Sequence, residues 1–246
     1  MDRMLYISMT GAKQTMLSQA THANNMANVS TTGFRADFAQ FRSMPVFGPG
    51  EPTRAYAQSE RPATDFTAGP IESTGRELDI AIKGEGLIAV QARDGNEAYS
   101  RRGDLFVDTF GQLRDGTGLP VLGENGPIAV PPAQSLVIGV DGTINIVPLG
   151  EDPNVTVVLD RIRLVNPPLD QLEKGNDGLM RQVNGLPAPA DAAVSVVSGA
   201  LERSNVNIIE SMVEMIATAR KYEMQVKAMT TADELSQHSM RLLSLQ

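Results

Sequence analysis

The first part of the chain carries a regular but thin apolar stripe. Apolar and small side chains recur at alternating steps of four and three residues, the spacing of a helix that presents one face to a partner. The pattern stops at residues 30–33, Ser-Thr-Thr-Gly, where hydroxyl groups compete for backbone hydrogen bonds and Gly33 can take a positive φ. We therefore predict a helix over about residues 1–30. Its stripe consists of Leu5, Met9, Ala12, Met16, Gln19, Ala23 and Met26.

Between about residues 45 and 200 the pattern changes to short apolar or alternating runs. Gly-rich or Asp-Gly segments between the runs are typical of hairpin turns, and Pro-rich joints mark boundaries or rigid turns. Many short strands with such turns predict an antiparallel β domain. The runs are 78–82, 87–90, 105–108, 120–123, 136–140, 143–147 and 155–165; the turns are 84–86, 94–95, 115–116 and 141–142; the joints are 45–52, 127–132 and 187–189.

The last part of the chain returns to the helical rhythm, from Ser204 to about Leu243. At ~1.5 Å per residue such a helix is about 60 Å long, more than a β domain needs to cap its core. The fold class is therefore α+β, with long, coiled-coil-like terminal helices flanking a mainly antiparallel β domain. The expected division is 1–44, 45–200 and 201–246. The C-terminal stripe is Met212, Met215, Ala219, Tyr222, Val226, Met229, Asp233, Ser236, Met240 and Leu243.

Composition excludes several function classes. The formal charge of −8 and the pI near 4.8 argue against nucleic acid or an anionic membrane surface as a partner, because both need a basic face. Cysteine is absent, which removes disulfides, thiolate metal sites and a cysteine nucleophile. No run approaches the ~18 apolar residues of a spanning helix, so we expect no membrane insertion. The start of the chain lacks the apolar core of a secretory signal, so we expect no cleaved signal peptide.

The chain shows no constellation of residues that carries catalysis. His22 and His238 lie at opposite ends of the sequence without acidic neighbours. The segment 83–86, Lys-Gly-Glu-Gly, joins two strands and lacks the helix that a phosphate-binding loop requires. The acidic residues Asp79, Asp104, Asp108 and Asp115 fall among turns, where Asp favours local backbone hydrogen bonds. We therefore predict no enzyme activity, no metal, no cofactor and no small-molecule substrate.

One segment is unusual for a helix at a protein surface. From Gln14 to Phe34 the chain contains no Asp, Glu, Lys or Arg, although 20% of its residues are charged. Uncharged polar side chains can be buried when they are hydrogen-bonded, whereas an unpaired buried charge is costly. Such a helix fits a protein-lined environment contacted on several sides. Its three Asn residues disfavour an isolated helix, so we expect it to become ordered on assembly. Periodicity alone leaves open a helix that packs on the β domain of its own chain.

Three stretches resemble one known family, the flagellar axial proteins that form the bacterial rod and hook. They are ANNMANVSTTGF near the start, LDIAIKGEGLIAVQARDGNEAYSRRGDLFVDTFGQLRDGTGLPVLGENGPI at 78–128, and SGALERSNVNIIESMVEMIATARKYEMQVKAMTTADEL at 198–235. The opening MDRMLYISMTGAKQT and the phrase GFRADFAQFRSMPV look most like proximal-rod members. Residues 150–190 match least distinctly.

The resemblance implies a structural subunit of the basal-body rod. Its partners would be other rod proteins, copies of itself and the flagellar export apparatus, and its location would be the rod across the periplasm. The terminal helices would pack in the inner layer of a tube with the β domain outside. A distal-rod or hook-type subunit is the alternative within the family, and a monomeric β-rich binding module or a β-rich enzyme with a cleft is the alternative outside it.

Within this reading the signature residues receive assembly roles. Asn24, Asn25 and Asn28 would fix the register against neighbouring subunits, as a buried Asn does in a coiled coil. Gly33 would permit the chain to turn outward, beside Phe34. The expected N-terminal assembly residues are Leu5, Met9, Ala12, Met16, Ala23, Asn24, Asn25, Met26, Asn28, Gly33 and Phe34. The expected C-terminal ones are Asn205, Asn207, Ile209, Met212, Met215, Ala219, Tyr222, Val226 and Met229.

Overall fold

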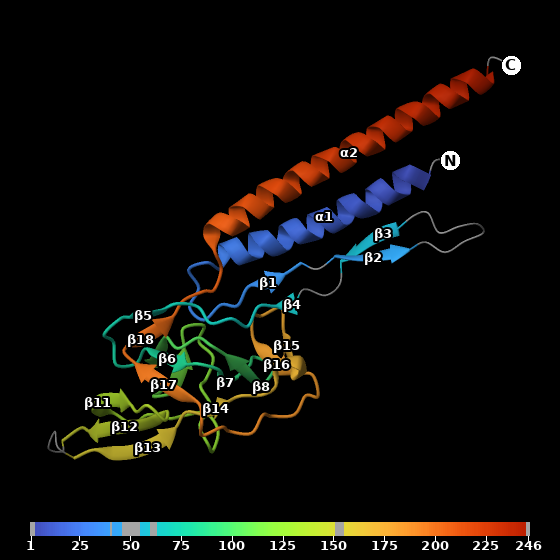
Figure 1. Ribbon diagram of the computed structural model, residues 1–246. Helices are drawn as coiled ribbons and strands as arrows, with labels where there is room; N and C mark the ends of the chain where they lie inside the picture. The colour runs from blue at the N-terminus through green and yellow to red at the C-terminus, as the bar shows by residue number, and fades with distance from the viewer. Residues whose placement is uncertain (1–2, 40, 46–54, 60–62, 151–154, 245–246) are drawn as a thin grey trace. The chain divides into compact units, whose positions relative to one another are not determined.

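The computed structural model describes residues 3–39, 41–45, 55–59, 63–150 and 155–244 (Figure 1). It is an α+β protein with one helix near each end of the chain and mainly antiparallel strands between them. The helices are α1, Arg3–Ala27, and α2, Ile208–Ser244. In the ranges described, neither helix combines the length and apolar character needed to cross a membrane.

The chain divides into two compact units. We call Met1–Val29, Ala36–Asp65 and Val206–Gln246 the helical unit, and Ser30–Arg35 with Phe66–Asn205 the β unit. The segment Ala36–Asp65 groups with the helices because its strands pair with one another and contact α1. The sequence division at 44/45 and 200/201 stays a prediction. The predicted joint at 45–52 lies outside the described residues beyond Pro45.

Short antiparallel pairs complete the helical unit. The first pair joins β1, Asp37–Phe38, to β4, Ala63–Thr64. The second joins β2, Phe41–Pro45, to β3, Ala55–Ser59, and β3 contacts α1. A two-stranded ribbon is marginally stable by itself. Its contact with α1 therefore contributes to holding it.

A five-stranded antiparallel sheet forms the centre of the β unit, in the order β14-β7-β8-β16-β15. The inner strand β7, between β14 and β8, is apolar throughout its first four residues and is buried on both faces. At one end of β8, Tyr99 is buried, and its Oη accepts a hydrogen bond of 2.6 Å from Ala188 N–H. Burial raises the pKa of Tyr99 to about 12. The strands are β7, Leu87–Gln91; β8, Glu97–Ser100; β14, Leu164–Val165; β15, Leu172–Lys174; and β16, Met180–Gln182.

Smaller sheets surround this centre and share its core. They comprise a three-stranded sheet, β11-β12-β13, and the pairs β9–β10, β17–β6 and β18–β5. Inward-facing Ile, Leu and Val side chains from these strands, except those of the pair β18–β5, form one continuous core with residues of β7. The strands are β5, Ile71–Ser73; β6, Ile80–Lys83; β9, Leu105–Val107; β10, Leu113–Asp115; β11, Ala133–Ile138; β12, Thr143–Pro148; β13, Val157–Arg161; β17, Ser195–Ser198; and β18, Ala200–Glu202, with a 3₁₀ turn at Leu169–Gln171.

Two predicted strands differ from the observed ones. The run 155–165 is divided between β13 and β14, which belong to different sheets, because Ile162 turns inward and bridges Gly123. The run 120–123 forms isolated bridges and no extended strand. The turn predicted at 115–116 is present, but the residue with positive φ is Gly118, and Asp115 caps the turn by accepting hydrogen bonds from Thr117 and Leu119 N–H.

Candidate assembly site

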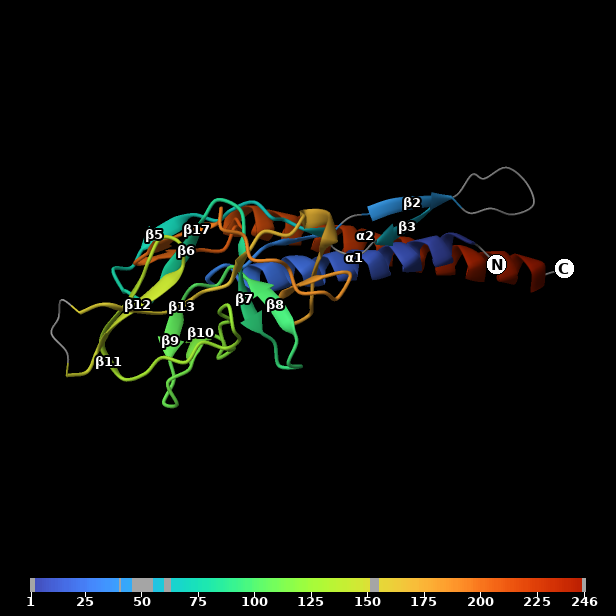
Figure 2. The same cartoon turned by 90° about the horizontal axis from the view of Figure 1, so that it is seen from below.

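The two helices of the helical unit lie side by side and run in opposite directions (Figures 1 and 2). His22 Nδ1 lies 3.1 Å from Glu214 Oε2. The sequence did not indicate this acidic neighbour, because the two residues are far apart along the chain. Nearer the N-terminus, Gly11 faces Gln225, whose Oε1 would lie 2.3 Å from a Cβ at Gly11. Helix α1 therefore packs on α2 within the single chain.

The face that α1 and α2 share is lined by small, uncharged side chains. Hydroxyl groups on this face bond to their own helix: Thr15 Oγ1 donates to Gly11 O at 2.8 Å, and Thr218 Oγ1 donates to Glu214 O at 2.7 Å. A buried methyl group contributes only about 0.8 kcal/mol, against about 1.5–3 kcal/mol for a buried Leu or Ile. The pair is therefore close but weakly held. The buried members are Ala12, Thr15, Ser18, Asn25, Ser211, Thr218 and Ala232.

Many of the bulky apolar side chains lie instead on the outer faces of the helices. On the first two turns of α2, Ile209 is 71% exposed and Val213 is 62% exposed, and Ile216 follows at 56%. A stripe of this kind on an exposed helix marks a surface that another protein covers. The exposed apolar residues are Tyr6, Met9, Met16 and Leu17 on α1 and Ile208, Ile209, Met212, Val213, Ile216, Met224, Leu235 and Met240 on α2.

The predicted stripes and the observed packing face overlap only in part. Among the predicted N-terminal residues, Ala12 is buried and Leu5 and Met26 are half-buried, whereas Met9, Met16 and Ala23 are exposed. The predicted C-terminal stripe lies along one edge of the intramolecular face. Among the predicted C-terminal assembly residues on α2, Met215, Ala219, Tyr222, Val226 and Met229 are half-buried, and Ile209 and Met212 are exposed.

The Asn residues have defined contacts within the chain. Asn25 is buried, and its amide both donates to Asp37 O at 2.8 Å and accepts from Asp37 N–H at 2.9 Å. Asn28 Nδ2 donates to Asn24 O at 2.9 Å. Asn25 thus joins the end of α1 to the start of β1, and a register role toward neighbouring subunits stays a prediction for all three Asn residues.

The second signature supplies the N-terminal cap of α2. Asn207 Oδ1 accepts hydrogen bonds from Ile209 N–H at 3.1 Å and Glu210 N–H at 3.4 Å, which is the arrangement that satisfies the first turn of a helix. In the β unit, Asn205 Nδ2 donates to Thr67 O at 3.1 Å. The two Asn residues therefore fix the chain where α2 begins.

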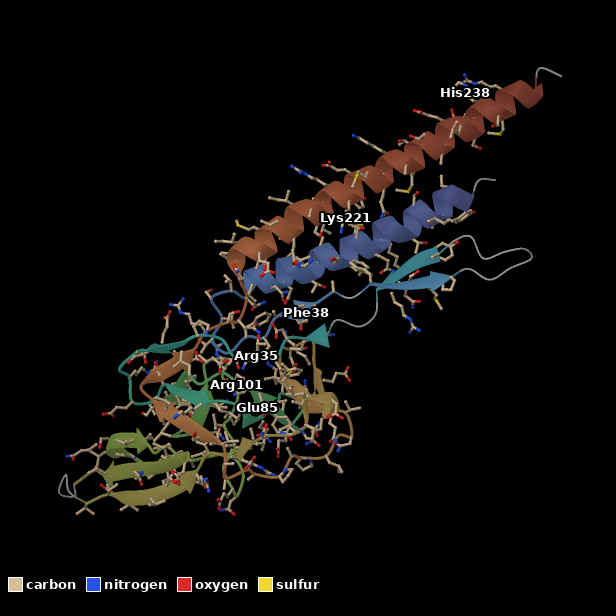
Figure 3. The ribbon with its side chains drawn as sticks, in the orientation of Figure 1. Arg35, Phe38, Glu85, Arg101, Lys221 and His238 are labelled. Carbon is tan, nitrogen blue, oxygen red and sulfur yellow. The ribbon has the colours of Figure 1, made fainter. Side chains whose placement is uncertain are left out.

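A buried ionic cluster in the β unit ties together the segments that lead to the two helices. Glu202 is 1% exposed, and its Oε1 lies 2.8 Å from Arg35 while its Oε2 lies 2.6 Å from Arg101. Figure 3 labels the two arginines of this cluster. Gly69 N–H also donates to Oε1, at 3.0 Å. Arg101 donates further to the carbonyl oxygens of Gly84 and Gly86. Both guanidiniums are therefore satisfied inside the protein, which a buried charge requires.

The backbone beside this cluster is equally constrained. Gly33 N–H donates to Glu202 O at 2.8 Å, and Asn205 N–H donates to Phe34 O. Lys174 Nζ donates to Arg35 O at 2.7 Å and lies 4.1 Å from the centre of the Phe34 ring. Lys174 comes from β15, so the region 150–190 has at least this role. The sequence pattern gave no sign of it.

Gly33 takes a φ of 66°, as the sequence predicts, and a Cβ there would lie 2.5 Å from the backbone of Arg101. We expect Gly33→Ala to lower the free energy of unfolding of the β unit by about 3 kcal/mol or more, since it adds a clash to an unfavourable φ. Gly75→Ala is the matched control, because Gly75 has a φ of 71° with no atom within 4 Å of its Cβ position. The control should lose only about 1–2 kcal/mol. Equal losses in urea denaturation would contradict the clash.

Sequence reasoning missed the small-residue face and the Glu202 cluster. The first had a signal, because Gly11, Thr15, Ser18, His22 and Asn25 follow a four-three rhythm of their own. The second had none, since Glu202 lies far along the chain from both Arg35 and Arg101. Within the described ranges no group of His, Asp and Glu side chains is arranged to hold a metal ion.

Comparison with known proteins gives three family matches along the chain. "Flagella basal body rod protein" matches residues 5–35, "Flagellar hook protein FlgE/F/G D1 domain" matches 81–146, and "Flagellar basal body rod FlgEFG protein C-terminal" matches 197–242. The chain is 40% identical over 251 residues to the flagellar basal-body rod protein FlgF of Escherichia coli strain K12, covering 100% of both chains. The FlgF of Salmonella typhimurium gives the same identity and coverage. The basal-body rod protein FlgG of Bacillus subtilis is 31% identical, with 98% of this chain and 99% of FlgG covered.

Proposed function

Because the chain belongs to the family of flagellar basal-body rod proteins, we propose that it polymerises through its two terminal helices into the rod, the shaft that carries torque from motor to hook. The family is one of structural proteins and not of enzymes. An identity of 40% to FlgF, against 31% to FlgG, supports a position in the proximal rod.

The observation that carries this proposal is the distribution of apolar side chains on the helices. The face that α1 and α2 share buries small residues, while Met16, Val213 and Ile216 are among the large ones left exposed. Covering such side chains contributes about 1.5–3 kcal/mol each, so neighbouring subunits gain more from these outer faces than the two helices gain from each other. The assembly residues predicted from the sequence include Met9, Met16, Ile209 and Met212, which lie on this outer surface.

The geometry of a helical polymer agrees with two separate outer faces. Each subunit of such a polymer needs two different complementary surfaces that do not close into a ring. The exposed apolar residues of α1 and those of α2 provide two surfaces on one helix pair. Methionines lie on both surfaces, and they can adapt to neighbours that are not identical, because the methionine side chain is unbranched and flexible.

The partners that follow are other rod proteins and further copies of this chain. The location that follows is the rod of the basal body where it crosses the periplasm. Delivery there would use the flagellar export apparatus and leave no cleaved signal peptide. The family supports these assignments.

The helix pair is further proposed to acquire its full, coiled-coil-like order only on assembly. Its shared face contains hydroxyl and small side chains, and α1 has Asn24, Asn25 and Asn28 near its end. Such a pair gives little stability by itself. Terminal helices with little stability of their own would delay polymerisation until subunits concentrate at the growing tip. The helices would become ordered, and lose conformational entropy, only at that point.

Limited trypsin digestion of the free chain and of intact basal bodies tests this account. In the free chain we expect rapid cleavage at Lys13, Arg220 and Lys227, which lie on α1 and α2, and a resistant β unit. In basal bodies the same sites should be resistant, because neighbouring subunits cover them. Rapid cleavage confined to one loop of the β unit in the free chain would favour a compact, monomeric module. Equal digestion of the helices in both preparations would contradict assembly through them.

A further inference from the structure

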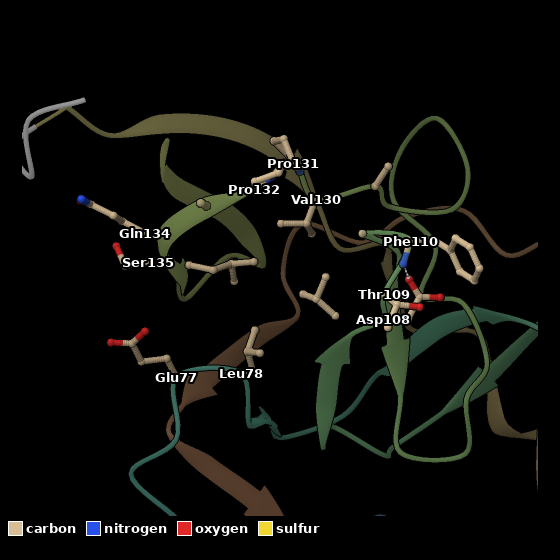
Figure 4. Close-up of a pocket in the computed structure, with 15 residues that line it drawn as sticks. Glu77, Leu78, Asp108, Thr109, Phe110, Val130, Pro131, Pro132, Gln134 and Ser135 are labelled. Atoms are coloured by element: carbon tan, nitrogen blue, oxygen red, sulfur yellow. Dashed lines mark hydrogen bonds between the residues drawn. The ribbon is translucent and has the colours of Figure 1, made fainter. Parts of the chain in front are cut away.

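Turns of the β unit commonly engage two groups at once, the side chain of an Asp or Asn and the N–H of a nearby glycine. Beside a hollow of about 810 Å³, Asp108 Oδ1 accepts a hydrogen bond from Phe110 N–H at 2.9 Å, and Gly111 N–H donates to Asp108 O at 3.0 Å (Figure 4). The same kind of contacts fixes the Asp-Gly turns at 94–95, 141–142 and 177–178. A side chain and a glycine held in this way have little freedom to react with each other.

The chain contains two Asn-Gly pairs, and one of them is held in the same manner. Asn184 Oδ1 accepts a hydrogen bond from Leu186 N–H at 2.9 Å, and Gly185 N–H donates to Gln182 O at 3.0 Å. Both Asn184 and Gly185 are exposed. Hydrogen bonds, and not burial, therefore restrain this pair.

The other pair, Asn125-Gly126, has neither restraint. Its turn is closed on one side only, by Gly123 N–H donating to Gly126 O at 2.7 Å. In the part of the chain that the structure describes, neither the Gly126 N–H nor the Asn125 side chain has a hydrogen-bond partner. Asn125 is exposed, and no atom lies within 4 Å of the Cβ position at Gly126. Both reacting groups are thus open to solvent.

Two neighbouring groups of this kind have the chemistry for a reaction within the chain. The main-chain nitrogen after an Asn is a nucleophile once it loses its proton, and its attack on the side-chain carbonyl carbon closes a five-membered ring. Glycine favours this attack, because it has no Cβ to shield the nitrogen and its backbone adopts many conformations. An N–H that is hydrogen-bonded must first be released by local opening of the turn. The fold therefore slows the reaction at Gly185 and leaves it unhindered at Gly126.

We propose that Asn125 is a site of spontaneous deamidation. The Gly126 nitrogen gives its proton to hydroxide and forms a bond to Asn125 Cγ. The bond from Cγ to the side-chain nitrogen breaks, and that nitrogen takes up a proton from solvent and leaves as ammonia. Water then adds to either carbonyl carbon of the ring and opens it. The products are aspartate and isoaspartate at position 125, and the net change is the exchange of ammonia for water.

The modification changes both the charge and the main chain of the β unit. Either product adds one negative charge. Isoaspartate also places the side-chain methylene in the main chain, in a turn that joins Val121 and Ile128, two residues of the buried core. Because the reaction requires only water, the converted fraction increases with the age of the molecule. It is independent of the helix-mediated assembly proposed above.

Incubation of the purified full-length chain in mildly alkaline buffer, followed by trypsin digestion and mass spectrometry, tests the proposal. Trypsin places the two Asn-Gly pairs on separate fragments, 115–161 and 182–203. Asn125 should be converted about fivefold faster than Asn184 or more, which is the factor that one hydrogen bond at Gly185 imposes. Chromatography should separate the aspartate and isoaspartate forms of fragment 115–161. Equal rates at the two sites, or faster conversion of Asn184, would overturn the proposal.

The same incubation in a denaturing concentration of urea tests whether the fold sets this order. Urea removes both turns, so the rates at Asn125 and Asn184 should become similar. A ratio of rates that denaturation leaves unchanged would assign the difference to the flanking residues and reject the role of the free Gly126 N–H.

Two variants locate the reaction. Asn125→Gln should abolish the conversion in fragment 115–161, because the longer side chain would have to close a less favourable six-membered ring. Asn184→Gln is the matched control and should leave the rate at Asn125 unchanged. Conversion of fragment 115–161 at the original rate in Asn125→Gln would place the reaction at another residue and overturn the assignment.

Discussion

Replacement of Glu202 by glutamine is expected to lower the free energy of unfolding of the β unit by about 3–5 kcal/mol. The carboxylate is 1% exposed and is the counter-ion of both Arg35 and Arg101. Its removal leaves two positive charges buried without a negative partner, and this cost exceeds the net value of the ion pairs themselves. Hydrogen exchange at the amides of Ile80 and Ile88, which lie in the buried core, measures the change.

Glu72→Gln is the matched control for this experiment. Glu72 is paired with Arg203 at 2.7 Å, but both side chains are more than half exposed. An exposed pair of this kind contributes about 0–1 kcal/mol. A loss below about 1 kcal/mol for Glu202→Gln, equal to that of the control, would show that the buried cluster has no special importance for the β unit.

The second large effect is expected on assembly. The double variant Val213→Glu, Ile216→Glu should fail to enter the rod, and cells that depend on it should be non-motile. Both side chains are exposed in the single chain, so helix content should be unchanged. In the polymer, each substitution loses about 1.5–3 kcal/mol of apolar burial and places a carboxylate in a covered face. Motility in soft agar and the presence of the variant in purified basal bodies are the measurements.

The control for this variant changes charge without removing an apolar surface. Lys221→Gln with Lys227→Gln makes the chain more negative by the same amount, at two exposed positions on α2 that are already polar. This control should retain motility. If both double variants abolish motility, the effect belongs to net charge. If neither does, the outer face of α2 does not bind a neighbour.

The sequence predicted the elements better than their packing. A helix expected from Ser204 to about Leu243 is observed at Ile208–Ser244, and every predicted run except 120–123 overlaps an observed strand. Several observed strands, among them β8, β10 and β15 to β18, lie outside the predicted runs. Apolar periodicity, however, identifies large side chains, while α1 and α2 meet through Thr15, Ser18 and Thr218. Hydroxyl groups that bond to their own helix can be buried, and a scale that counts them as polar assigns them to the surface.

The part of the site that sequence could not predict depends on distance along the chain. Arg35 and Arg101 are far from Glu202 in sequence and meet only when the β unit is folded. The role of Lys174 beside Phe34 is hidden for the same reason. A local signal was reliable where the backbone requirement is local, as for the positive φ of Gly33.

The central claim is that the outer apolar faces of α1 and α2 are covered by other subunits in the rod. Because the chain contains no cysteine, a single thiol introduced at Met16 or Ile216 reports on one face at a time. The direct measurement is the rate at which a maleimide alkylates each thiol in intact basal bodies and in the free chain. The account predicts much slower alkylation of both thiols in basal bodies. Equal rates in the two preparations would contradict it.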